Sequence, residues 1–240
     1  MKHVNFSFRL IPIYGLVFLL VILITLMGNK AVQAVSETAL IKRTHTIIID
    51  AGHGGEDGGA LSCTGVPESA INLEIALRLN DLMQFLGFQT KMIRTEDISI
   101  YTEGESISQK KISDLKARVR ICNETEGAVL LSIHQNTFPD SRYSGAQVFY
   151  PATAGSKDFA TDLQAALIRT VNPGSKRAAK KAQGIYLMEH VQCPAILLEC
   201  GFLSSVEEEA RLRSHSYQNK LCCVIASTTA RFVLDAQTND

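Results

Sequence analysis

The sequence of 240 residues contains no tryptophan, only six prolines, and no excess of charge of either sign, with 24 basic against 24 acidic residues. This balance leaves no overall positive field to attract nucleic acid, so a nucleic-acid-binding protein is not expected. Internal repeats and Gly/Ser- or Pro-rich linkers are also missing, which excludes a solenoid or a string of modules. With 46% hydrophobic residues, the sequence predicts a globular protein with a sizeable core.

The six cysteines are not arranged in any C-x-x-C pair. This spacing argues against a zinc ribbon and against a redox motif. Several cysteines lie within apolar stretches such as CPAILLEC and LCCVIA, where buried free thiols are common. We therefore expect mostly structural thiols rather than a disulfide framework.

One long uncharged run, Leu10 to Met27, follows Lys2 and Arg9. Such a run behind basic residues at an N-terminus is typical of an export signal or a membrane anchor. Both alternatives stay open, because a small-residue cleavage site ends at Ala34 while about 20 apolar residues also suffice to span a bilayer. We therefore predict that residues 1–35 are a signal peptide or anchor, that any membrane contact is confined to them, and that the protein acts outside the cytoplasm.

The remaining chain, residues 41–236, predicts one α/β domain. Three continuous aliphatic runs are typical of strands covered on both faces: Thr46 to Asp50, Ala128 to Ile133 and Ala195 to Glu199. Weaker strand candidates are Gln89 to Ile93, Ala146 to Tyr150 and Gly184 to Leu187. Apolar spacings of three and four predict helices at Pro67 to Leu86, Ser108 to Asn123, Lys157 to Val171 and Ser205 to Leu234, the last broken near Ser214. This alternation predicts a mainly parallel sheet with helices on both faces.

Ionisable residues follow each of the three strongest strand candidates. His53 lies in D-A-G-H-G-G after the first, His134 in S-I-H-Q-N at the end of the second, and Glu199 ends the third. Glu68 follows the turn G-V-P and lies in the first turn of the next helix. Because ligands of open α/β sheets bind at the carboxyl ends of the strands, we expect these four side chains to meet there.

Two imidazoles and one carboxylate form a known catalytic zinc ligand set that leaves a fourth position open. Zinc accepts nitrogen and oxygen ligands together, whereas magnesium prefers oxygen. We therefore predict that His53, Glu68 and His134 bind one Zn²⁺, which would polarise a carbonyl. Glu199 is the predicted general base, passing a proton from water to a leaving nitrogen.

Other residues near this predicted site are alternatives. Asp50 and Asp57 flank His53 and are rival ligands, although Asp50 is better placed to orient the loop or a ligand imidazole. Cys63 and Cys200 are also near, but alternation along a strand should turn Cys200 to the opposite face. We expect structural roles for the remaining histidines, His3, His45, His190 and His215.

The most polar stretch runs from Ile98 to Lys116. It predicts a solvated loop followed by the exposed face of a helix. A lid over the site or a docking surface for a partner is the alternative.

Four motifs, in a fixed order, point to a known family: IIIDAGHGGEDGGA, GVPESAINLEIALRL, LLSIHQN and CPAILLECGFLSSVEEE. Over residues 45–235 the chain resembles the zinc-dependent N-acetylmuramoyl-L-alanine amidases of the third amidase family. The resemblance implies a single α/β domain with a six-stranded, mainly parallel sheet. It also implies hydrolysis of the amide that joins N-acetylmuramic acid to the L-alanine of the stem peptide in peptidoglycan.

Carried over by position, the resemblance makes His53, Glu68 and His134 the zinc ligands and Glu199 the catalytic glutamate. Gln135 replaces the family's usual small residue, and a serine follows Glu68 where the family often has lysine. Neither difference removes a ligand, but both bear on how the substrate fits.

Within the family, the chain most resembles the germination-specific amidases of the spore cortex. The shared features are the polar insertion leading into KISDLKARV, the stretch NTFPDSRYSGAQVFYP and the stretch KKAQGIYLMEH. This implies removal of stem peptides from cortex glycan strands on the way to muramic-δ-lactam, in the forespore intermembrane space. An accessory or activating protein as a further partner is an open hypothesis that rests only on the composition of the polar stretch 98–116. A vegetative autolysin-type amidase, another exported zinc peptidase and a catalytically silent wall-binding scaffold are the alternatives.

Overall fold

The computed structural model describes residues 11–140 and 142–235. Contacts within the chain divide it into two compact units, and the boundary between them in the sequence falls between Ile41 and Lys42. The first unit contains most of helix α1 (Ile11–Thr44), on which apolar side chains such as Leu16 and Phe18 are exposed. Among the described residues, no helix combines the length and hydropathy needed to cross a membrane. The predicted segment 1–35 begins in the undescribed residues 1–10, and its role stays a prediction.

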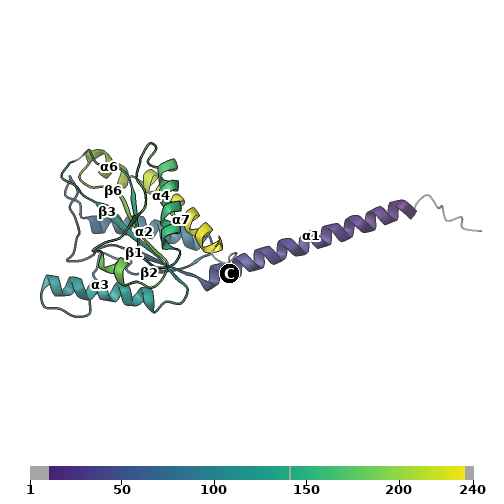
Figure 1. The fold of residues 1–240 in the computed structure, drawn as a ribbon, viewed down its shortest axis with the longest axis horizontal. Helices are drawn as coiled ribbons and strands as arrows, with labels where there is room; N and C mark the ends of the chain where they lie inside the picture. The colour runs from purple at the N-terminus through teal and green to yellow at the C-terminus, as the bar shows by residue number, and fades with distance from the viewer. Residues whose placement is uncertain (1–10, 141, 236–240) are drawn as a thin grey trace, which may run out of the picture. The chain divides into compact units, whose positions relative to one another are not determined.

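The second unit is built around a six-stranded sheet with the order β2-β1-β3-β6-β4-β5 (Figure 1). Every neighbouring pair is parallel except β4 with β6. The strands are β1 (Thr46–Ala51), β2 (Gln89–Met92), β3 (Ala128–Asn136), β4 (Gln147–Tyr150), β5 (Lys180–Lys181) and β6 (Ala195–Phe202). The predicted α/β class and mainly parallel sheet are confirmed.

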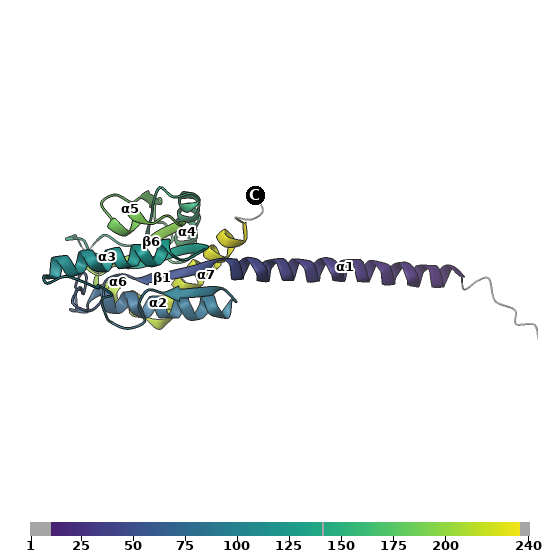
Figure 2. The ribbon, with the colours of Figure 1, turned by 90° about the horizontal axis from the view of Figure 1, so that it is seen from below.

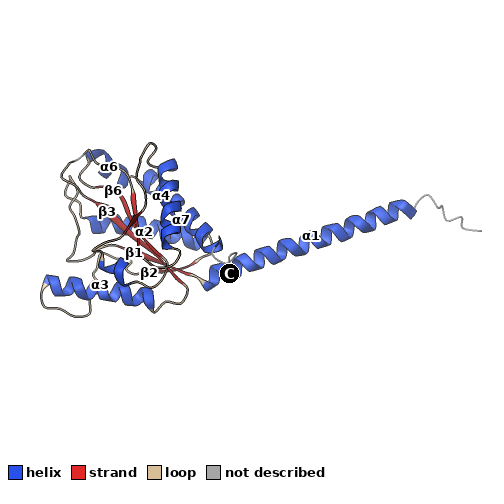
Figure 3. Ribbon diagram, viewed as in Figure 1, coloured by secondary structure: helices blue, strands red, loops and turns tan. Residues whose placement is uncertain are grey.

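Helices cover both faces of this sheet, as predicted. Helices α2 and α4 both pack against α7 on one face, and Figure 3 shows α4 beside α7. Helices α3 and α5 pack together on the other face, and Figure 2 shows α2 and α3 on opposite sides of β1. Their bounds are α2 (Glu68–Phe85), α3 (Ile107–Asn123), α4 (Ser156–Thr170), α5 (Tyr186–His190), α6 (Val206–Leu212) and α7 (His215–Asp235). The predicted break near Ser214 is confirmed, because it separates α6 from α7.

The central strand β1 shows why the continuous aliphatic runs became central strands. Ile47, Ile48 and Ile49 are all fully buried, although consecutive strand side chains point to opposite faces. Ile48 packs with Leu130 and Leu197 in the cluster that also includes residues of α5. Helices on both faces therefore bury the central strands β1, β3 and β6, whose carboxyl ends carry the candidate site.

The predicted strand from Gly184 to Leu187 is wrong. Gly184 has a φ of +68°, and its N–H donates to the Glu189 carboxylate, 2.6 Å away, so the chain turns there into helix α5. Ile185 and Leu187 both pack on the core, which gives the segment an apolar alternation resembling that of a strand. The sixth strand is instead the short β5, which pairs with β4.

Candidate active site

The loop after β1 brings His53 to the carboxyl edge of the sheet. His53 itself has a φ of +60°, a conformation that side-chain-bearing residues rarely adopt. Just before it, Gly52 lies against the ring of His134, where an added Cβ would be 2.2 Å from Cε1. Glycine at position 52 therefore allows the β1 loop and the His134 ring to approach each other.

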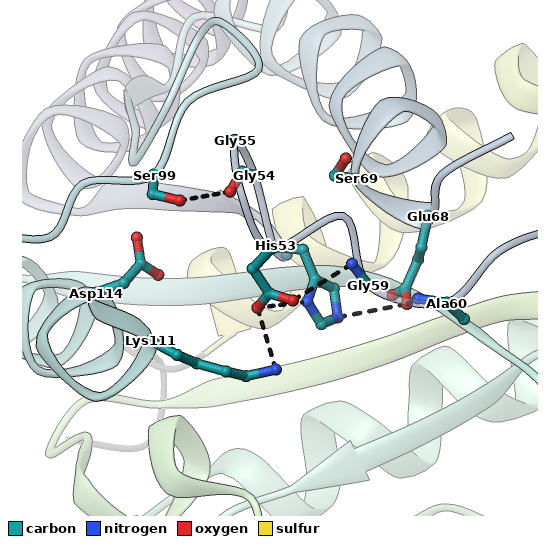
Figure 4. Close-up of polar contacts among 12 residues, drawn as sticks. His53, Gly54, Gly55, Gly59, Ala60, Glu68, Ser69, Ser99, Lys111 and Asp114 are labelled. Atoms are coloured by element: carbon teal, nitrogen blue, oxygen red, sulfur yellow. Dashed lines mark hydrogen bonds and ion pairs between the residues drawn. The ribbon is translucent and has the colours of Figure 1, made fainter. Parts of the chain in front are cut away.

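Three of the predicted site residues meet in one cluster. Ligand atoms of His53, Glu68 and His134 all lie within 4.8 Å of one another. Nε2 of His53 is 3.3 Å from Oε2 of Glu68, and Nδ1 of His134 is 3.1 Å from Oε1 of the same carboxylate. Figure 4 shows Glu68 pointing from the start of α2 toward His53 and Ala60. We refer to these three residues as the triad.

The Glu68 carboxylate is buried and held by several donors. Pro67 precedes it as the N-cap of α2. The backbone N–H of Ala60 donates to Oε2, while Oε1 accepts from the side chain of Asn72 and the backbone of Gln135. Burial would raise the pKa of Glu68, but hydrogen bonds with the two triad histidines dominate and hold it well below its usual range. The carboxylate is thus ionised and fixed in position.

The second ring nitrogen of His53 contacts Asp57, which sequence reasoning had retained as a rival ligand. Nδ1 of His53 is 2.9 Å from Asp57 Oδ2, and the same oxygen lies 3.1 Å from Nζ of Lys111 on α3. Figure 4 shows Lys111 reaching from α3 toward this loop. Burial alone would lower the pKa of His53, but its bonds with Asp57 and Glu68 raise that pKa to about 9. Asp57 therefore orients the imidazole from behind and does not join the triad.

Asp50, the other rival ligand, lies behind the loop. It accepts hydrogen bonds from Arg118 of α3 and from Oγ of Ser132, at 2.6 Å for the latter. Arg118 also donates to the carbonyl oxygens of Ala51 and His53, at 3.0 and 2.8 Å. Burial would raise the pKa of Asp50, but the Arg118 guanidinium keeps it lowered. As predicted, Asp50 orients the loop, and it acts through an arginine that the motif analysis did not single out.

Glu199 lies next to the triad on β6. The register pairs it with His134 of β3, so both side chains project to the same face of the sheet. Its Oε2 atom is buried and has no hydrogen-bond partner within the described chain. Burial raises the pKa of Glu199 to about 7, and the negative charge of Glu68 adds to this effect, against the lowering influence of the two histidines. A carboxyl group in this state can both accept and donate a proton near neutral pH.

A cavity of about 320 Å³ opens beside the triad, between α3 and α5. His53 and His134 form its floor, Lys111 and Leu115 lie on the α3 side, and Tyr186 lies on the α5 side. The polar stretch 98–116 therefore supplies a wall of the site in addition to exposed residues. The low hydropathy of this stretch did not predict its role as a wall of the cavity, because a charged side chain such as Lys111 is expected in solvent.

The cysteines and the other histidines stay outside the triad. All six cysteines are free thiols in the described part of the chain. Cys63 donates to Glu209 of α6, and Cys200 is buried with its thiol directed to the carbonyl of Leu198. His45, His190 and His215 are likewise not among the triad ligand atoms, and His3 lies outside the described residues.

Comparison with solved structures places the same fold in known amidases. The CwlD amidase from Clostridioides difficile, solved in complex with the GerS lipoprotein, has a TM-score of 0.76 and 36% identity, covering 80% of this chain and 99% of that one. A second N-acetylmuramoyl-L-alanine amidase, from Clostridium difficile 630, has a TM-score of 0.69 and 29% identity, covering 81% and 98%.

Sequence comparison agrees with the structural one. The germination-specific N-acetylmuramoyl-L-alanine amidase of Bacillus subtilis (strain 168) is 37% identical over 188 residues, 78% of each protein. The amidase LytC of the same organism is 28% identical over 78% of this chain but only 35% of its own length. The family model described as N-acetylmuramoyl-L-alanine amidase matches residues 47–229, which include all four predicted site residues and the whole sheet except Thr46, the first residue of β1. The chain therefore belongs to the N-acetylmuramoyl-L-alanine amidase family and is a peptidoglycan amidase.

Proposed function

We propose that this amidase uses one Zn²⁺, bound by His53, Glu68 and His134, to release stem peptides from peptidoglycan by cutting the bond between N-acetylmuramic acid and L-alanine. The observation that carries this proposal is the convergence of the three ligand side chains beside Glu199, whose Oε2 atom is buried without a hydrogen-bond partner in the described chain. The family membership gives the class of bond.

The donor set of the triad fits zinc. Two imidazoles and one carboxylate match the ligand chemistry of catalytic zinc sites, whereas magnesium would require mainly oxygen. With Nδ1 of His53 engaged by Asp57, its Nε2 faces Glu68 and is the nitrogen left for a metal. A carboxylate behind a ligand histidine is also the usual arrangement in zinc proteins.

A bound zinc ion would act as a Lewis acid on the substrate carbonyl and lower the pKa of water at the site. Glu199, which the register places opposite His134, accepts the proton of the attacking water on its carboxylate. The protonated carboxyl then delivers this proton to the leaving nitrogen of L-alanine. A pKa near 7 suits both halves of this transfer.

We assign the biological role to the spore cortex, where loss of stem peptides precedes formation of muramic-δ-lactam. The 37% identity to a germination-specific amidase, over most of both proteins, supports this role more than the 28% identity to LytC supports a vegetative one. We place the enzyme outside the cytoplasm, in the forespore intermembrane space. The complex of the CwlD amidase with the GerS lipoprotein supports an accessory protein as a partner here as well.

Mass spectrometry of purified cortex peptidoglycan tests this function. The full-length protein is incubated with the glycan, first with zinc and then with a chelator. We expect zinc-dependent release of intact stem peptides that begin at L-alanine. Fragments cut within the stem peptide would instead indicate a peptidase. A folded, zinc-loaded protein that releases nothing, with or without a lipoprotein partner, would contradict the proposal.

Replacing Asp57 with asparagine should weaken zinc binding without removing a ligand. The amide can no longer hold His53 through a charged hydrogen bond, and loss of such a partner typically costs about 10–100-fold in metal affinity. Titration of the apo-protein with zinc against a competing chelator measures the effect. Glu56→Gln is the matched control, because Glu56 lies in the same loop but pairs only with Lys110 in the described chain. Equal affinities in the two variants would contradict the role of Asp57.

A further inference from the structure

An exposed pair of aromatic side chains, Phe138 and Tyr143, lies on the loop that follows β3. The two side chains are 44% and 48% exposed, and their ring centroids are 4.5 Å apart. Large aromatic groups kept together in solvent forgo the free energy of burial, and such patches commonly mark binding surfaces. The catalytic steps described above do not use them. We call this pair the aromatic platform.

The platform is supported from below. The ring of Tyr143 lies 6.3 Å from that of Phe202, the buried last residue of β6. The guanidinium of Arg177 also lies over the ring of Phe202, 5.1 Å from its centre. It donates a hydrogen bond to the backbone carbonyl of Ser144. The backbone N–H of Phe138 is fixed by the hydroxyl of Ser204, at 3.1 Å. The platform is thus a supported surface, held through Tyr143 by Phe202 of β6 and through Phe138 by the turn that follows β6.

The sheet register relates Phe202, the residue beneath the platform, to the reacting groups. His134 pairs with Glu199, and Asn136 pairs with Phe202, with an irregularity of one residue between the two pairs. Asn136 lies two positions after His134 and therefore projects to the same face of the sheet. Since paired residues share a face, Phe202 projects to the same face as Glu199. Two residues along a strand span about 7 Å. The platform therefore lies at the carboxyl edge of β6, one ring contact away from Phe202 and on the same edge of the sheet as Glu199.

We propose that the aromatic platform binds a sugar ring of the glycan strand next to the muramic acid that is being cut, an inference that rests on the proposed function. A pyranose ring presents C–H groups on its faces and hydroxyl groups at its edge, so an aromatic surface half open to water suits it. The charged neighbours Asp140 and Arg142 form an ion pair with each other, at 2.7 Å, and the Arg177 guanidinium lies against the ring of Phe202 beneath the platform. The cavity between α3 and α5 is then free for the stem peptide.

Steady-state kinetics on two substrates test this assignment. We compare the full-length wild type with the double variant Phe138→Ala/Tyr143→Ala on polymeric cortex glycan and on a single N-acetylmuramoyl-peptide. We expect KM on the polymer to rise roughly tenfold, the usual effect of removing central aromatic contacts, with kcat within about twofold. The single-sugar substrate should show no change, because it has no neighbouring ring. Phe85→Ala, which removes an aromatic side chain that is 86% exposed at the far end of α2, is the matched control.

Binding to peptide-free glycan strands separates this inference from the amidase proposal, since it needs no turnover. We expect the wild type and Phe85→Ala to co-sediment with the strands equally, and the double platform variant to bind roughly tenfold more weakly. Unchanged binding, or an equal rise in KM on both substrates, would overturn the platform assignment. Weaker binding of the double variant would support it even if the wild type released no stem peptide.

Discussion

Glu199→Gln should lower turnover by about two orders of magnitude or more, while the zinc content stays close to one per chain. Glutamine has the size of glutamate but cannot accept the proton of the attacking water. No hydrogen bond of the described chain would be lost at Oε2, since that atom has no partner. The register of β6 with β3 does not depend on this side chain, so the fold should be retained.

Two measurements on the same sample check this expectation: the rate of stem-peptide release and the zinc content by elemental analysis. Glu207→Gln is the matched control, because Glu207 is an exposed glutamate in the first turn of α6, away from the triad. Turnover close to that of the wild type would remove Glu199 from the mechanism. Loss of zinc together with loss of activity would make Glu199 a ligand instead of a base.

His134→Ala and His53→Ala should each lose the metal and, with it, all measurable activity. Each variant leaves only two triad ligands, so the loss in zinc affinity should exceed the roughly 100-fold that removal of a mere supporting group can cause. Zinc titration against a competing chelator provides the readout, with circular dichroism to verify the fold. Folding should survive, because the core of the sheet consists of aliphatic side chains beneath the triad.

The control for the histidine variants is His215→Ala, which alters an exposed histidine at the start of α7. We expect this variant to bind zinc like the wild type. Zinc retention in both triad variants would refute the ligand assignment. Retention in one of them alone would identify that histidine as a neighbour of the metal instead of a ligand.

The central sheet could be predicted because burial on both faces leaves a direct trace in the sequence. The runs of β1, β3 and β6 are mostly aliphatic, with Ser132 as a polar interruption in β3, until His53, His134 and Glu199 follow toward the carboxyl ends. Parallel strands align these ends, so the convergence of the residues was also predictable. The short edge elements were not, because Ile185 and Leu187 alternate like a strand while Gly184 turns the chain into α5.

The supporting groups of the site were harder to predict. Asp50 and Asp57 both flank His53, and their spacing alone could not decide which one contacts the imidazole. The decision depends on α3: Arg118 engages Asp50, while Lys111 reaches Asp57. Such contacts between residues more than fifty positions apart depend on how a helix packs across the sheet, which periodicity does not encode.

The position of β6 has a consequence for when this enzyme can become active. β6 is the last strand of the sheet in chain order, yet it lies in the interior of the sheet, next to β3. A growing or emerging chain therefore has all three triad residues well before it has Glu199, and until residue 202 is available β3 has β1 on one side but lacks β6 on the other. Because pairing of distant segments forms late in folding, the hydrolytic centre is completed only when nearly the whole domain is present.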